Sequence, residues 1–273
     1  MEGPRNNRSA WWLRPGNFPG RRWLAGTSGG TVLLVVVLAL AWYVSSFFVP
    51  EYVFPTIGST AGKFVSVVTT TTSYKSLVYT LQRVLGGFLI SALTGIALGV
   101  GMGTQPKFYT ICMPLVKLIM GIPALTWVLL SIIWFSSTEL RVWFIMFILV
   151  FPIVTTNTYD GVRSISPELH QMVQSLRPSP AAMLRLLVIP SALPFIFSGL
   201  RIGLSFGGRI AVFAEALSAS SGIGAQMFMM DQLFDTAGII VWTILLVMAL
   251  SLLDLVLTTV EARWFRWRPA AYN

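Results

Sequence analysis

Six long apolar stretches, separated by short polar connections, restrict what this chain can fold into. They span roughly 31–49, 84–103, 108–135, 142–159, 193–217 and 238–260. As an α-helix that rises about 1.5 Å per residue, each is roughly long enough to cross the ~30 Å hydrocarbon core of a bilayer. The composition agrees, because 55% of the 273 residues are hydrophobic and only 11% are charged. We therefore expect an all-α membrane protein with six transmembrane helices.

The formal net charge of +9 raises the question of a nucleic-acid partner, and the placement of the basic residues answers it. Six spans put both ends of the chain on one side of the membrane. That side holds twelve basic residues, Arg5, Arg8, Arg14, Arg21, Arg22, Lys107, Arg163, Arg177, Arg185, Arg263, Arg266 and Arg268. The other side holds three, Lys63, Lys75 and Arg141. Because cytoplasmic segments carry the excess of positive charge, we expect both termini in the cytoplasm, lipid as a partner and no nucleic acid.

The chain divides into one membrane domain and two tails. Residues 1–28 are polar and are expected to form a poorly ordered cytoplasmic tail; 29–268 form the membrane domain, and 269–273 a C-terminal tail. The first apolar stretch runs into Phe47-Phe48-Val49-Pro50 without a small-residue cleavage site, so we interpret it as a retained helix and not a signal peptide. A short surface helix is predicted near Thr60–Val68, in the first outer connection.

The connection over 160–192, between the fourth and fifth stretches, carries strong local signals. Ser166-Pro167 is typical of an N-cap followed by a first-turn proline, and Glu168 suits the positive end of that helix. In Arg177-Pro178 the proline disfavours helical backbone before it, so we expect Arg177 to be extended and the helix to end there. Ser179-Pro180 starts a second helix in the same way. We predict a short helix, a tight turn and another helix that reach into water, where a partner can push on them.

Small residues recur every four positions in two of the stretches, which places each row along one helix face. The rows are Gly87, Ser91, Gly95, Gly99 and Gly103, and Gly199, Gly203, Gly207 and Ala211. Such rows let helix backbones approach closely, and packing of this kind holds helices together in lipid. Two compatible interpretations stay open, which are static packing of a bundle and surfaces that slide in a moving transporter.

Several segments occur in the order that a known family shows. They are Leu81-Gln-Arg-Val-Leu-Gly-Gly-Phe88, Trp127 through Phe135, Asn157-Thr-Tyr-Asp-Gly-Val-Arg-Ser164, Ile189-Pro-Ser-Ala-Leu-Pro194, Gly199-Leu-Arg-Ile-Gly203 and Ala214-Glu215. On these segments the chain resembles the permease subunits of type I ABC importers, in the branch that moves nitrate, taurine, aliphatic sulfonates, bicarbonate or pyrimidine precursors. The resemblance implies the type I importer permease fold in a bacterial inner membrane, with a cytoplasmic coupling helix.

The family's hallmark in the cytoplasmic loop is only partly present. It reads Glu-Ala-Ala, three residues, Gly, nine residues, then Ile-x-Leu-Pro, and here the register falls on Gln171-Met172-Val173, Arg177 and Leu187-Val188-Ile189-Pro190. The glycine of the family permits a left-handed turn residue, which Arg177 replaces. In the family this loop docks in a groove of the ATPase. The resemblance assigns this coupling role to Glu168, His170, Gln171, Met172, Val173, Arg177, Leu187 and Pro190.

The resemblance also implies partners and a solute path. The partners are a second permease subunit (the same chain or a sister chain), two ABC ATPase subunits and an extracytoplasmic solute-binding protein. ATP and magnesium belong to the ATPase subunits, so no cofactor is expected in this chain. Two alternatives stay open: the divergent half of an asymmetric permease pair, and a membrane scaffold without its own path. A passive channel is a third class.

Charged residues at membrane depth are costly and therefore indicate function or pairing. Lys117 and Arg209 add positive charge where the resembled family has other residue types, and a guanidinium can grip a carboxylate, sulfonate or nitrate. The competing interpretation is pairing with an internal acid, Glu215 or Asp254. We expect a solute path lined by Lys117, Pro123, Trp127, Arg209 and Glu215, in which the Gly and Pro of Met120–Ala124 interrupt the third stretch. Arg83 and Arg201 are expected to be structural or to reach the interface.

Catalysis is not expected in this chain. His170 is the only histidine, Cys112 is the only cysteine, and no Gly-rich loop ending in Gly-Lys-Ser/Thr occurs. No His/Cys cluster has the spacing of a metal site. ATP hydrolysis must therefore come from another subunit.

Overall fold

The computed structural model describes the backbone of residues 20–264, and side chains from Gly29 onward. Within that range the ordered elements are helices, and the described residues form no strand. Two units are distinguished, residues 1–57 and 58–273. Residues 1–19 of the predicted N-terminal tail, the last four residues of the predicted membrane domain and the predicted C-terminal tail 269–273 lie outside the described residues, and with them Arg5, Arg8, Arg14, Arg266 and Arg268.

The first unit contains α1 (Gly20–Phe48), a single long helix. Its apolar part, Gly29–Phe48, is long enough to cross a membrane, and none of that part is buried within the chain. A helix that is apolar on all sides needs lipid or another protein around it. The helix begins inside the stretch that was predicted to be a polar tail.

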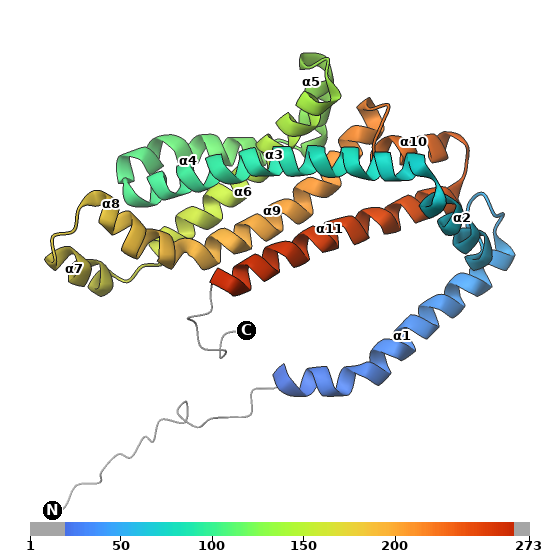
Figure 1. Ribbon diagram of the computed structural model, residues 1–273, viewed down its shortest axis with the longest axis horizontal. Helices are drawn as coiled ribbons and strands as arrows, with labels where there is room; N and C mark the ends of the chain where they lie inside the picture. The colour runs from blue at the N-terminus through green and yellow to red at the C-terminus, as the bar shows by residue number, and fades with distance from the viewer. Residues whose placement is uncertain (1–19, 265–273) are drawn as a thin grey trace, which may run out of the picture. The chain divides into compact units, whose positions relative to one another are not determined.

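The second unit is a bundle (Figure 1). Its long helices are α3 (Thr71–Thr104), α6 (Thr138–Arg163), α9 (Ile189–Ser218) and α11 (Thr236–Trp264). Shorter helices are α2 (Ile57–Thr69), α4 (Pro106–Gly121), α5 (Ala124–Trp134) and α10 (Ile223–Gln232). By length and composition, the described residues contain five helices that could cross a membrane, or six if the bent pair α4 and α5 counts as one span. The short helix predicted at 60–68 is confirmed as α2, whereas α10 was not predicted.

The small-residue rows of α3 and α9 both pack against α6, which makes α6 the central helix of the bundle. A Cβ added at Gly87 would lie 2.6 Å from Cβ of Met146, and one at Gly203 would lie 2.8 Å from Cγ1 of Val150. Real Cβ atoms do not approach that closely, so the α3 and α9 backbones are as near to α6 as glycine allows. These rows therefore serve bundle packing, the first of the two interpretations, around a core that includes Val150 and Val154.

The third apolar stretch breaks where its Gly and Pro residues predict. α4 ends at Gly121, α5 begins at Ala124, and the two helix axes differ by 93°. Pro123 supplies no N–H and has extended backbone (φ −57°, ψ 138°), which stops the helix. The break is confirmed; the right-angle turn of α5 away from α4 was not foreseen.

The connection over 160–192 begins each helix as the sequence predicts. α7 (Pro167–Ser175) and α8 (Pro180–Met183) both start with a proline, and the Oγ atoms of Ser166 and Ser179 each accept a backbone N–H at 3.2 Å. α8 continues through a π-helical segment, Leu184–Val188, into α9 without a break. The second predicted helix is therefore the start of the fifth span. We call the segment Ser166–Pro180 the elbow.

Arg177 corrects one expectation. Its φ is +49°, in the left-handed region, where the sequence predicted extended backbone. The residues before it close α7 with tight turns, as the Arg177 N–H donates to the Gln174 carbonyl at 2.9 Å and the Leu176 N–H donates to Val173 at 3.2 Å. A left-handed residue directly after the last helical turn is a common way for a helix to end, and Arg177 adopts it although Pro178 follows. Arg177 thus adopts the left-handed conformation that the family's glycine permits.

Candidate functional site

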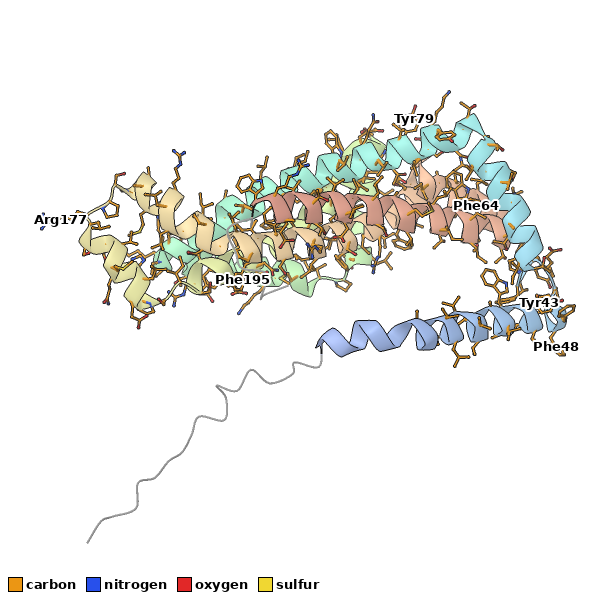
Figure 2. All side chains as sticks on the ribbon, turned by 60° about the horizontal axis from the view of Figure 1, so that its bottom comes forward. Tyr43, Phe48, Phe64, Tyr79, Arg177 and Phe195 are labelled. Carbon is orange, nitrogen blue, oxygen red and sulfur yellow. The ribbon has the colours of Figure 1, made fainter. Side chains whose placement is uncertain are left out.

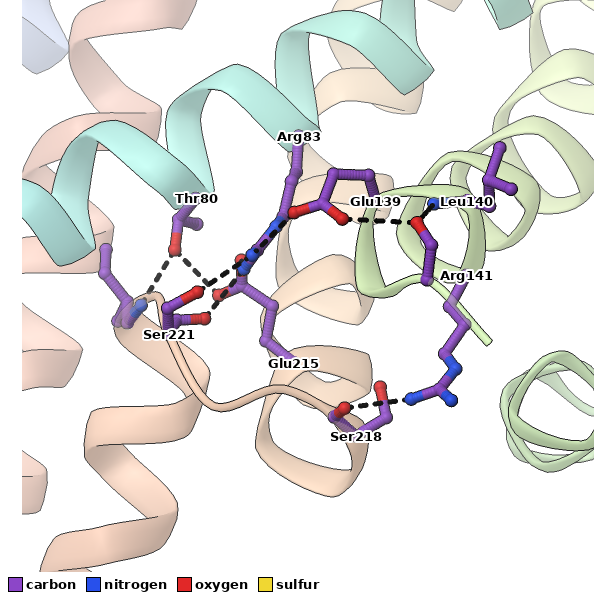
Figure 3. Close-up of polar contacts among 10 residues, drawn as sticks. Thr80, Arg83, Glu139, Leu140, Arg141, Glu215, Ser218 and Ser221 are labelled. Carbon is purple, nitrogen blue, oxygen red and sulfur yellow. Dashed lines mark hydrogen bonds and ion pairs between the residues drawn. The ribbon is translucent and has the colours of Figure 1, made fainter. Parts of the chain in front are cut away.

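Most candidate residues lie in four regions: a buried polar cluster at the α10 end of the bundle, the elbow at the opposite end, the exposed face of α9, and the break between α4 and α5. The polar cluster, which we call the hub, joins α3, α9 and the loop before α10 (Figure 3). Arg83 Nη1 lies 2.8 Å from Oε1 of Glu215 and 2.7 Å from the carbonyl of Ser221. The Thr80 hydroxyl donates to Oε2 of Glu215 at 2.7 Å. Glu215 is 0% exposed and Arg83 is 5% exposed, so the pair is buried.

The backbone of the loop before α10 completes the hub. The Ile223 N–H donates to the Thr80 hydroxyl at 2.8 Å, and the Gly224 N–H donates to Glu215 Oε2 at 3.2 Å. Gly222 has a φ of +109°, and a Cβ there would lie 2.5 Å from Glu215 Oε2. Only glycine fits that position, for its backbone conformation and for its space. Glu215 was predicted in the solute path, but both of its carboxylate oxygens are engaged inside the protein.

A second acid extends the hub to the surface. Arg83 Nη2 lies 3.1 Å from Oε1 of Glu139, whose side chain is 54% exposed. The neighbouring Arg141 donates from Nε to the Phe135 carbonyl at 2.6 Å and from Nη1 to the Ser218 carbonyl at 3.0 Å. These bonds tie the start of α6 to the end of α9 (Figure 3). The pairing of Arg83 confirms its expected structural role, but its partners lie more than 50 residues away in sequence and no spacing pattern identifies them.

The elbow presents an exposed helix and a hollow. No residue of α7 is buried, and Leu169, Met172 and the residue that caps its end, Leu176, form an exposed apolar row, with Met172 61% exposed and Leu176 78% exposed. Arg177 lies at its tip (Figure 2). A hollow of about 760 Å³ separates α7 from the bundle, with walls that include His170, Gln171 and Arg163.

The residues predicted to couple the chain to an ATPase fall into two groups. Exposed on the elbow are Glu168, His170, Gln171, Met172 and Arg177, with Val173 half-buried. Farther along the chain, Leu187 is only 4% exposed and Pro190 is half-buried at the start of α9. The residues of the first group are therefore accessible to a partner protein, whereas Leu187 packs inside the protein.

The exposed face of α9 carries one cation. Along it lie Ile202, Phe206, Arg209 and Phe213, spaced three or four residues apart, and we call this row the α9 stripe. Arg209 Nη2 donates to the hydroxyl of Ser205 at 3.1 Å, and no acid pairs with Arg209 among residues 29–264. Gly207 and Gly208, expected to leave space beside the guanidinium, instead face Val150 and Leu250 in the packed interior.

The acids that could neutralise the pathway cations are already paired. Glu215 pairs with Arg83, and Arg201 pairs with both Asp254, at 3.4 Å, and Glu261. Pairing of Arg209 with Glu215 or Asp254, the competing interpretation, is therefore wrong within the described chain. Arg201 has the structural role expected for it.

The other pathway candidates surround the break in the third stretch. Pro123 lines a hollow of about 410 Å³ whose walls also include Pro152 of α6 and Ile202 and Phe206 of the α9 stripe. Lys117, six positions before Pro123 on α4, is exposed. Trp127 is half-buried, stacks edge-on against Phe144 and does not line this hollow. The structure thus brings Pro123 together with the face of α9 that carries Arg209. Among the described residues no group of three His, Cys, Asp or Glu side chains could hold a metal ion.

Comparison with known proteins gives a consistent picture. Residues 91–266 match the family described as binding-protein-dependent transport system inner membrane component. The taurine transport system permease protein of Escherichia coli is 29% identical over 72% of this chain and 71% of its own length. The bicarbonate transport system permease protein of Synechococcus elongatus is 32% identical over 55% of this chain and 54% of its length.

A solved structure supports the fold. A chain of the MetNI methionine ABC transporter, in an inward-facing conformation, aligns with a TM-score of 0.59 at 15% identity, over 72% of this chain and 99% of that chain. The family match covers more than half of the chain, and the expected type I importer permease fold is confirmed. The chain belongs to the inner-membrane permease components of binding-protein-dependent ABC importers.

Proposed function

We propose that this permease forms the membrane path for a small anionic solute and that partner ATPase subunits drive it through the elbow. The role of the elbow rests on its exposed apolar row, Leu169, Met172 and Leu176. The helix that carries this row, α7, has no buried residue. An amphipathic helix with an unburied apolar row suits a groove on another protein. ATP and magnesium are held by the ATPase subunits, and this chain transmits their movement.

The conformation of Arg177 supports retained coupling despite the incomplete family motif. The left-handed backbone that the family's glycine permits is present at Arg177, with φ +49°. The turn that presents α7 is therefore kept although the glycine is absent. This favours a working coupling helix over a scaffold or an uncoupled half of a permease pair.

The assembly follows from the family and the charge pattern. We infer two permease subunits, two ATPase subunits on the elbow side and a solute-binding protein on the side of the hub. Both termini lie on the ATPase side, which the excess of Arg and Lys there supports. The anionic class is supported by the relatives that move taurine and bicarbonate and by Arg209 and Lys117, with which no acid of the described part of the chain pairs.

Site-directed crosslinking tests the elbow contact. In a Cys112→Ser background, Met172→Cys is paired with a single cysteine in the surface groove of the ATPase, and disulfide formation is measured with and without ATP in membranes. Leu140→Cys is the matched control. Leu140 is also an exposed apolar residue, but it lies near the start of α6, whereas the elbow follows the end of α6.

We expect crosslinking from Met172→Cys that changes with ATP, and none from Leu140→Cys. Crosslinking from Leu140→Cys alone would place the ATPase at the hub and reject the proposal.

A further inference from the structure

Arg209 lies well inside the membrane span that α9 forms, where a cation without an acid partner among residues 29–264 is energetically costly. It lies nine residues before Ser218, the last residue of α9, which is about 14 Å along a helix. The apolar residues around it, Phe206 and Phe213, are exposed on the same face. A guanidinium on a lipid-facing surface at this depth is strongly disfavoured. The α9 stripe therefore faces protein or a water-filled path.

The contacts of Arg209 leave most of its donors free. A guanidinium has five N–H donors in a planar fork, and among residues 29–264 that of Arg209 hydrogen-bonds only to the Ser205 hydroxyl. That bond, across one helical turn, restrains one edge of the group. The remaining donors can bind two oxygens of a carboxylate, sulfonate, nitrate or bicarbonate at once, which a lysine cannot do with the same geometry.

A hollow lies about one helical turn from Arg209 along α9. Ile202 and Phe206 of the α9 stripe line the hollow of about 410 Å³ at the break between α4 and α5. The walls of this hollow are mostly apolar, and Arg209 lies three residues beyond Phe206 on the same helix face, outside this lining.

We propose that Arg209, positioned by Ser205, is the anion-selecting contact of the translocation path. The inference rests on the proposed anionic-solute function and adds the residue that recognises the charge. The solute binds the free edge of the guanidinium during transit and passes along the α9 stripe, past the hollow at Pro123.

The test uses the assembled importer, with both permease subunits, the ATPase and the binding protein, in proteoliposomes. Uptake of taurine, bicarbonate and nitrate is measured separately for wild type, Arg209→Gln, Arg209→Lys and Ser205→Ala. Lys75→Gln is the matched control, since Lys75 is an exposed cation on α3 far from α9 in sequence. Assembly is followed by co-purification, and ATPase activity is measured with the solute-loaded binding protein.

We expect Arg209→Gln to lower uptake by about tenfold or more, because a charged hydrogen-bonded contact is lost. Subunit assembly and the stimulated ATPase activity should remain. Arg209→Lys should be intermediate, Ser205→Ala mildly reduced, and Lys75→Gln within about twofold of wild type, because an exposed charge contributes little.

Two results would overturn the role of Arg209. Unchanged uptake by Arg209→Gln would remove it from the path, and loss of the second permease subunit from that variant would assign Arg209 to an inter-subunit ion pair. A wild-type importer that moves none of the three anions would instead reject the anionic-solute class, which is a separate failure of the proposed function.

Discussion

The hub and the elbow lie at opposite ends of the same bundle and are stabilised in opposite ways (Figure 1). In the hub, the Arg83 and Glu215 side chains are buried and held by bonds from three segments of the chain. In the elbow, no residue of α7 is buried, and its caps and turn hydrogen bonds are local. The difference indicates that one end is a fixed joint of the bundle, and it agrees with the proposal that a partner binds the other.

The largest expected effect is at the buried pair. Glu215→Ala leaves the Arg83 guanidinium buried with only partial compensation, which costs about 3–5 kcal/mol of unfolding free energy. Thermal unfolding of the purified permease in detergent measures it. Glu139→Gln, at the exposed partner of Arg83, should cost about 1 kcal/mol or less. Equal losses for the two variants would show that burial does not distinguish the hub.

A substitution in the loop before α10 should lower the unfolding free energy by nearly as much. Gly222→Ala forces a side chain into left-handed backbone and against the Glu215 carboxylate, at a cost of about 2–3 kcal/mol. The same unfolding assay applies. Gly62→Ala is the control, since nothing lies within 4 Å of a Cβ there. If Gly222→Ala unfolded at the wild-type temperature, the hub would not be rigid.

At the elbow, a single change is expected to stabilise the helix end. Arg177→Gly removes the cost of left-handed backbone, about 1 kcal/mol, and should slow hydrogen exchange of the α7 amides. Arg185→Gly is the matched control, because Arg185 lies in the helical run after α8 and the same replacement should there speed exchange. Faster exchange in both variants would contradict the strain assigned to Arg177.

The smallest effect concerns a half-buried ion pair, Lys63 with Asp235. Burial raises the pKa of the Asp235 carboxyl, but the Lys63 ammonium and the Gly238 N–H lower it by more, so the pKa lies below its usual value. Stability from such a carboxyl is fully present above its unfolded pKa of about 3.9 and is lost as the pH falls through the folded pKa.

Asp235→Asn should therefore lower the unfolding free energy by roughly 1 kcal/mol or less at pH 7 and by less at pH 3. Unfolding of both proteins at the two pH values measures the difference. If the loss of unfolding free energy in Asp235→Asn were larger at pH 3 than at pH 7, the lowered pKa given for Asp235 would be wrong.

Local signals in the sequence predicted much of the fold. The Ser-Pro pairs at 166 and 179 start helices, and Pro123 breaks the third stretch, because capping and the missing proline N–H act within a few residues. Arg177 was predicted wrongly because two local rules compete there, and closure of α7 prevailed over the restriction from Pro178. Apart from the third, the spans were predicted shorter than the helices, since hydropathy misses polar helical ends such as Thr71–Val78.

The candidate site was only partly predictable. The unusual cations Lys117 and Arg209 were recognisable as residues, but the sequence did not show that no acid among residues 29–264 would pair with them. Glu215 was expected near the solute, and the tertiary structure instead places it with Arg83 inside the hub. No spacing rule connects residues that are 132 positions apart.

The amino-acid sequence alone determined the apolar spans, the helix starts, the orientation signal and the family, because each depends on composition or on neighbours along the chain. Only the tertiary structure decided which charges are neutralised and which remain open. The reason is physical: burial and a partner within hydrogen-bond distance set the cost of a charge at membrane depth, and both arise from helices brought together by packing. Arg83 is buried and paired, whereas Arg209 is exposed and has no acid partner within 29–264, and that contrast locates the proposed anion contact.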